Sequence, residues 1–182
     1  TAERLTMAWR TFGAGTKEAR LATIAAEILS NQGDVGLIDT NINQKQTALG
    51  AGAYTSVFND YGYLAMSISV KEGQTLEEGK KLLLAEVEKI KKGDFDEWMI
   101  KAINNNMKLD EMKTFESADG LATTMYSAYI QGRNWSEIVS EVDEYSKITK
   151  ADIVKFANDF FKDNYVIVYK RKGVNDKLVR VS

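Results

Sequence analysis

The fold is decided by residues 34–71, DVGLIDTNINQKQTALGAGAYTSVFNDYGYLAMSISVK. Near the end of this stretch every second residue is apolar, and smaller or more polar residues lie between them (Leu64, Met66, Ile68 and Val70 against Tyr63, Ala65, Ser67 and Ser69). A period of two predicts a strand with one buried face. A lone two-stranded hairpin is marginal in water, so we expect further strands and a layer of helices to complete the sheet.

The partner strand of this hairpin is predicted at residues 46–58, which are small or β-prone. The sequence NDYG at 59–62 supplies a turn in which Gly62 can adopt a positive φ. Gly50 and Gly52 would weaken a regular strand, so they predict a β-bulge or the close approach of another backbone.

Two more segments have strand character and are expected to join the same sheet. Residues 4–13 place Leu5, Met7 and Trp9 on one face, and residues 165–169, YVIVY, form a closing strand. The segments between the strands carry apolar residues at helical spacing, and they are grouped along the chain. This grouping predicts an α+β fold, a mostly antiparallel sheet covered by helices, rather than a doubly wound parallel sheet.

Helix boundaries are predicted mainly from capping residues. Thr16 begins a helix that ends at Ser30, and Asp34 is placed to cap a short helix carrying Leu37, Ile38 and Ile42. Thr75 with Glu78, and Asp94 with Glu97, have the spacing of capping boxes, and Gly93 separates the two helices. The second of these helices ends somewhere between residues 104 and 116, because NNN at 104–106 has weak helix propensity.

Three further helices are expected in the second half of the chain. The first covers residues 117–131, with Leu121, Met125, Ala128 and Tyr129 as its apolar positions. A short helix starts at Asn134 and buries Ile138, Val139, Val142 and Tyr145, and the last helix starts at Thr149. Residues 1–173 are therefore predicted to form one domain, and residues 174–182 a polar tail or linker to a following domain.

Composition excludes several classes of function. The chain has 182 residues and a net charge of −2 with a pI near 5.4, and it contains no basic block, which argues against nucleic acid as a partner. No apolar run approaches the roughly 20 residues that cross a bilayer. The sequence contains no His and no Cys, so neither a Ser–His site nor a His- or Cys-ligated zinc site can be complete within it.

The clusters that could suggest a site have simpler explanations. Asp94, Asp96 and Glu97 are expected to cap and charge a helix start, and Lys89, Lys91 and Lys92 are last-turn cations of the preceding helix. Core packing is expected for the tryptophans, Trp9, Trp98 and Trp135. The run Lys170-Arg171-Lys172 is too short to predict nucleic-acid binding. We therefore predict no catalytic, cofactor-binding or metal-binding residue in this chain.

Several short motifs, taken in order, resemble those of the pitrilysin or insulinase-type (M16) zinc metallopeptidases. They are Ile28-Leu29-Ser30, Gly36-Leu37-Ile38, the hairpin with Gly62, Gly93-Asp94-Phe95, and the segments TKADI at 149–153 and NYVIVYK at 164–170. The resemblance covers nearly the whole chain. It implies the LuxS/mitochondrial processing peptidase-like fold, in which homologous domains pair into a clamshell around peptide substrates.

The same resemblance implies that this chain is a non-catalytic domain. The family's zinc motif, His-x-x-Glu-His, cannot occur without His, and Zn²⁺ is expected in a catalytic domain elsewhere in the parent protein. The family's C-terminal half tends to supply an Arg and a Tyr from the hairpin corresponding to residues 49–66, where this chain has Tyr54, Tyr61 and Tyr63 but no Arg.

The resemblance therefore predicts a non-catalytic part of a bacterial M16 zinc metalloendopeptidase that packs against a catalytic domain and helps enclose peptide substrates. The catalytic domain belongs to the same parent chain or to a partner subunit. The alternative is a catalytically silent scaffold or interaction subunit of the same fold. A periplasmic or cell-envelope location is expected from the family alone.

Overall fold

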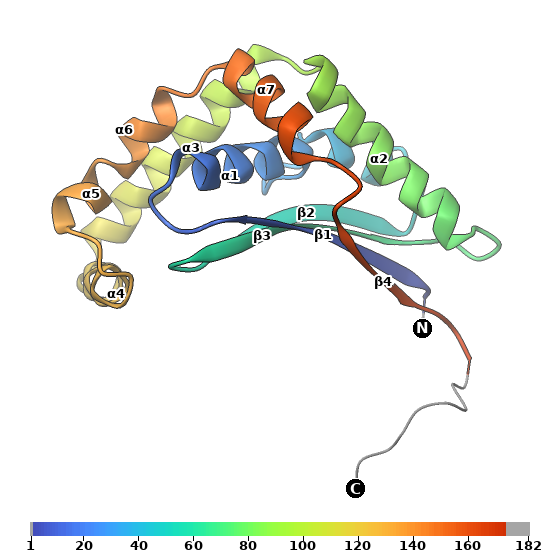
Figure 1. Cartoon of the computed structure of the whole chain (residues 1–182), viewed down its shortest axis with the longest axis horizontal. Helices are drawn as coiled ribbons and strands as arrows, with labels where there is room; N and C mark the ends of the chain where they lie inside the picture. Colours follow the sequence, from blue (N-terminus) through green and yellow to red (C-terminus); the bar gives the residue numbers. More distant parts are fainter. Residues whose placement is uncertain (1, 174–182) are drawn as a thin grey trace, which may run out of the picture.

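The computed structural model describes residues 2–173, so the predicted tail at 174–182 lies outside the described residues. Figure 1 shows one layer of helices covering one face of a sheet. The four strands are all antiparallel to their neighbours, in the order β2-β3-β1-β4. The elements are β1 Arg4–Phe12, α1 Lys17–Leu29, η1 Asp39–Asn43, β2 Gly50–Val57, β3 Tyr61–Ser69, α2 Leu76–Lys92, α3 Glu97–Glu116, α4 Ala118–Ile130, α5 Trp135–Val139, α6 Glu141–Ser146, α7 Lys150–Phe160 and β4 Val166–Lys170.

The predicted sheet and its buried face are confirmed. On β3, Leu64, Met66 and Ile68 are fully buried and pair with the buried residues of β1 (Trp9, Met7 and Leu5). The Trp9 ring packs edge-on against Phe161 at 5.2 Å, and its Nε1 donates a hydrogen bond to the Lys162 carbonyl (2.9 Å). These contacts join the sheet to the end of α7, so the first strand and the last helix share one core.

Most predicted helix boundaries are also confirmed. The Thr16 hydroxyl accepts from the Ala19 amide at the start of α1. Thr75 with Glu78 forms a capping box at α2, and Thr149 with Asp152 forms another at α7. Gly93 ends α2 in the left-handed conformation, with φ 71°. None of the described helices is long and apolar enough to cross a membrane.

The hairpin differs from the prediction in three ways. β2 begins at Gly50 rather than residue 46, because the chain is still turning at Gln46, whose φ is 51°. No bulge interrupts β2, whose pairing with β3 is continuous from Gly50 opposite Ser69 to the end of the strand. Gly62 lies within β3 and does not have a positive φ; a Cβ there would lie 2.5 Å from the Ser56 carbonyl oxygen. The close approach occurs at Gly62, not at Gly50 or Gly52.

The short helix after α1 is held by a different aspartate from the one expected. Asp34 does not cap it, because Asp34 itself has a φ of 53° in the preceding turn. The buried carboxylate of Asp39 accepts hydrogen bonds from Ser30 Oγ (2.8 Å), the Asn31 amide (2.9 Å) and the Gly36 amide (3.1 Å). The segment is a π-helix, and the hydrogen bonds of its first residue, Asp39, hold it against the end of α1.

Two helix predictions in the second half need correction. Asp94 does not cap α3. Its amide donates a hydrogen bond to the Lys89 carbonyl (2.8 Å) at the end of α2, and the residue directly before α3 is Asp96. α3 continues through residues 104–106 and ends at Glu116, at the far limit of the range predicted for its end. The single short helix predicted from Asn134 is broken at Ser140 into α5 and α6.

Candidate functional site

The acidic cluster predicted to be structural lies at the turn between α2 and α3. Asp96 Oδ2 accepts a hydrogen bond from Trp98 Nε1 at 3.1 Å, and Glu97 begins α3. Within residues 2–173, no three His, Cys, Asp or Glu side chains come together in a way that could hold a metal ion. The expectation that the chain has no catalytic or metal-binding residue stays a prediction.

Aromatic side chains gather near the hairpin end of the sheet, at positions that alternate with the buried residues of β3 and therefore lie on the face turned away from the helices. Tyr54 and Tyr63 pack edge-on at 6.1 Å between ring centroids, and Phe58 lies 5.4 Å from Tyr61. Burial, followed by the neighbouring Tyr63, raises the pKa of Tyr54. The face therefore offers aromatic surface on two neighbouring strands.

An arginine completes this aromatic face, although none occurs in the hairpin itself. The Arg10 guanidinium on β1 lies over the Tyr61 ring, 5.3 Å from its centroid. This pair was not predicted, because the family resemblance places the arginine within the hairpin itself. The signal was present, since Arg10 alternates with the buried Trp9 and belongs on the opposite face.

A second exposed surface is formed by α4 and α5, which together we call the helical arm (Figure 1). In α4 only Ala128 is buried, and Asp119 is the only charged residue. The large side chains are exposed, among them Tyr129 at 86%, Tyr126 at 66%, Ile130 at 52% and Met125 at 51%. Met125 and Tyr129, two of the apolar positions from which this helix was predicted, therefore face solvent and not the core.

Two contacts on either side of the turn between α4 and α5 attach the arm to the rest of the domain. Asn59 Nδ2, in the turn between β2 and β3, donates a hydrogen bond to the Ile130 carbonyl at 3.0 Å. Trp135 packs against Phe115 at the end of α3, with 5.6 Å between ring centroids. Trp135 is 39% exposed and Trp98 52% exposed, so of the three tryptophans only Trp9 lies in the core as predicted.

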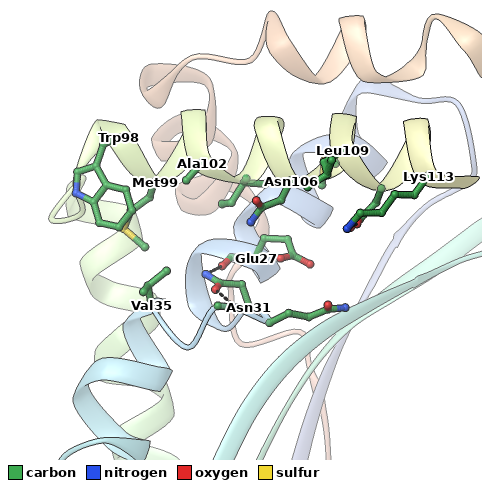
Figure 2. A pocket seen from close by; sticks show the side chains of 14 residues that line it. Glu27, Asn31, Val35, Trp98, Met99, Ala102, Asn106, Leu109 and Lys113 are labelled. Carbon is green, nitrogen blue, oxygen red and sulfur yellow. Dashed lines mark hydrogen bonds and ion pairs between the residues drawn. The ribbon is translucent and has the colours of Figure 1, made fainter.

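A pocket of about 260 Å³ lies between α1 and α3 (Figure 2). Trp98 and Lys113 lie toward its two ends on α3, and Glu27 and Asn31 lie across from them at the end of α1. Burial, followed by the charges of Asp39 and Asp110, raises the pKa of the Glu27 carboxyl. None of the residues that line this pocket was predicted from the sequence to bind a ligand, and Trp98 was predicted to lie in the core.

These features define an α+β domain whose helices cover one side of a sheet and whose described residues assemble no metal site. Residues 1–107, more than half of the chain, match the family model described as the peptidase M16 inactive domain. The chain therefore belongs to the peptidase M16 inactive domain family. The resemblance stated from the sequence is confirmed.

Solved structures confirm the α+β fold. A protease from Helicobacter pylori superposes with a TM-score of 0.85 at 18% identity, over 94% of this chain and 41% of that protein. The inactive peptidase domain of a proposed zinc protease from Bordetella parapertussis gives a TM-score of 0.79 at 14% identity, over 97% and 96% of the two chains. This chain thus spans about two fifths of the Helicobacter protein and nearly all of the Bordetella domain. No curated protein matches the sequence.

Proposed function

We propose that this chain is the non-catalytic domain of an M16 zinc metallopeptidase, and that its helical arm packs against the catalytic domain. The observation that carries this proposal is the exposed apolar surface of α4. A soluble domain rarely exposes a group of large apolar side chains unless that surface meets a partner. Tyrosine and methionine are also among the residues enriched at protein interfaces.

The energetics of α4 support the same proposal. An isolated helix shorter than about 12–15 residues is marginal in water, and most helices in proteins are stabilised by burying an apolar face. α4 has 13 residues and buries one of them. A partner that covers Tyr126, Tyr129 and Ile130 would supply the missing burial.

The open face of the sheet is our candidate for contact with peptide substrates. Tyr54, Tyr61 and Tyr63 present rings with polar hydroxyls, and Arg10 adds a cation that can pair with a peptide carbonyl or carboxylate. Zinc would be held by His and Glu ligands of the catalytic domain, because this chain has no His. The domain's part in the reaction is then to position the peptide and exclude water.

The test combines this chain with the M16 catalytic domain of the same parent protein or complex. We expect the chain alone neither to retain zinc through dialysis nor to cleave unfolded peptides, and we expect its addition to raise peptide turnover by the catalytic domain. The double variant Tyr126→Ser/Tyr129→Ser should lose this effect, whereas Leu49→Ser, which also removes an exposed apolar side chain, should keep it.

Two results would contradict the proposal. Chelator-sensitive cleavage by the purified chain would show that the chain is itself catalytic. Binding to its partner with no change in turnover would favour the silent scaffold subunit instead. Reading the parent sequence for His-x-x-Glu-His is an independent test. It distinguishes a non-catalytic domain of a zinc peptidase from a silent scaffold subunit.

A further inference from the structure

The pocket between α1 and α3 combines apolar walls with carboxylates. Met99, Ala102 and Ile103 line it from α3, and Leu109 lies on the same helix, 49% exposed. Glu27 lies on the opposite side, at the end of α1 (Figure 2). An unbranched aliphatic stem with a polar end would match this combination of walls.

The Glu27 carboxylate lacks a partner within the described part of the chain. The nearby Asn31 is occupied elsewhere: its Nδ2 donates to the Glu27 backbone carbonyl (3.0 Å), and its Oδ1 accepts from the Gly33 amide (3.0 Å). Among residues 2–173 no side chain forms an ion pair with Glu27. A partly buried carboxylate in this state favours a cation that enters from outside.

The charges around the pocket are predominantly negative. Burial, followed by the charges of Asp39 and Asp110, raises the pKa of the Glu27 carboxyl. The buried Asp39 is surrounded by hydrogen-bond donors but by no cation among the described residues. Lys113 is the one cation that lines the pocket, and it lies 3.9 Å from Asp110 as an exposed pair.

We propose that this pocket binds the side chain of a lysine or arginine residue, with its aliphatic stem against Ala102 and Ile103 and its cationic end beside Glu27. The exposed Trp98 ring at one end of the pocket provides a further apolar surface for the part of the ligand that carries this side chain. The inference goes beyond the proposed function and does not depend on it, because it concerns the helix layer and not the open face of the sheet or the arm.

The experiment is a titration of the folded chain followed by ¹H–¹⁵N NMR, with the Trp98 indole and the Asn106 side-chain amide as reporters. The probes are Nα-acetyl-lysine amide and Nα-acetyl-arginine amide. Nα-acetyl-norleucine amide is the control, because it keeps an aliphatic stem and lacks the charge. We expect saturable shifts at the pocket with both cationic probes, and at least about fivefold weaker binding of the norleucine probe.

Variants separate the charge of the pocket from its shape. Glu27→Gln should weaken binding of the lysine probe about fivefold, whereas Glu18→Gln, near the start of the same helix, should leave it unchanged. Ala102→Leu should block the pocket without changing its charge. Lys113→Gln removes a competing cation and should keep or tighten binding.

Folding of each variant is checked by its amide spectrum. Equal binding of the norleucine probe, unchanged binding to a folded Glu27→Gln variant, or loss of binding in Lys113→Gln would each overturn the proposal. Because none of these measurements uses a catalytic domain, their outcome is independent of the turnover test.

Discussion

Two helices of equal length, α1 and α4, have opposite relations to the rest of the molecule. Each has 13 residues, and each begins with a hydroxyl side chain, Thr16 or Ser117, that accepts a hydrogen bond from a backbone amide of the first turn. Eight residues of α1 are buried, compared with one of α4. Similar local signals thus start a helix that the core holds in place and a helix that presents its apolar side chains to solvent.

This difference shows that capping residues determine where a helix begins. Burial of its apolar side chains determines whether the helix stabilises the core or exposes an apolar surface. α1 packs against the sheet and against α2, α3 and α7, and so stabilises the domain. α4 contacts mainly α3 and α5, so its apolar residues contribute little to the domain's own core. The contrast can be tested by substitutions that act on one region and spare the other.

The largest effect is expected from Ile68→Asp. Ile68 is fully buried on β3, and an unpaired carboxylate there costs several kcal/mol against a total stability of roughly 5–15 kcal/mol. Tyr129→Asp, in the arm, should change the free energy of unfolding by less than about 0.5 kcal/mol. Urea denaturation of both variants measures this, and comparable losses at the two positions would remove the distinction between core and arm.

A smaller but still clear loss is expected from Gly62→Val. Its Cβ would lie 2.5 Å from the Ser56 carbonyl oxygen and 2.6 Å from Thr11 Oγ1, so the neighbouring strands have to shift, at a cost of about 1–3 kcal/mol. Gly50→Ala is the matched control, because a Cβ there meets no atom within 4 Å. Thermal unfolding of both variants gives the comparison; a Gly62→Val variant as stable as wild type would mean that the hairpin packs differently.

Capping substitutions should sharpen the comparison further. Thr75→Ala removes half of the capping box of α2 and should cost about 1 kcal/mol in global stability, because α2 packs into the core. Ser117→Ala should instead increase hydrogen exchange locally at the start of α4 with little change in global stability. Equal changes in the melting temperatures would argue that α4 folds as part of the core.

The smallest expected effect is a pH dependence at the surface. Hydrogen bonds from Thr149, followed by Lys17, lower the pKa of Asp152 from 3.8 to about 2. A lowered folded-state pKa means that Asp152 stabilises the fold above pH 3.8 and that this contribution is lost as the pH falls toward 2. NMR titration of the carboxyl group measures the pKa directly, and Asp152→Asn should reduce the loss of stability in this window. A pKa near 3.8 would contradict the capping geometry.

The sequence predicted the regular parts of this fold well because each rests on a local pattern. The alternation of Leu64, Met66 and Ile68, the capping box of Thr75 and the stop at Gly93 are each visible within a few residues. The predictions are wrong where contacts between residues far apart in the sequence determine the local structure. Asp39 rather than Asp34 holds η1 because its partners come from the end of α1, and Gly62 is needed because β1 and β2 approach it.

The candidate surfaces were harder to predict for the same reason. Helical spacing places Met125 and Tyr129 on one face, but spacing does not say whether that face meets the core or solvent. The pairing of Arg10 with Tyr61 requires two strands to be placed side by side, and the pocket at Glu27 requires α1 and α3. The family resemblance could predict a non-catalytic domain, but not which surface it would use.

Hydrogen–deuterium exchange, measured on this chain alone and when bound to the M16 catalytic domain, tests most directly whether the arm is the contact surface. Our account predicts strong protection of residues 121–139 in the complex and little change over the exposed side of α2. Protection confined to α2, or a complex in which residues 121–139 exchange as fast as in the free chain, would contradict it.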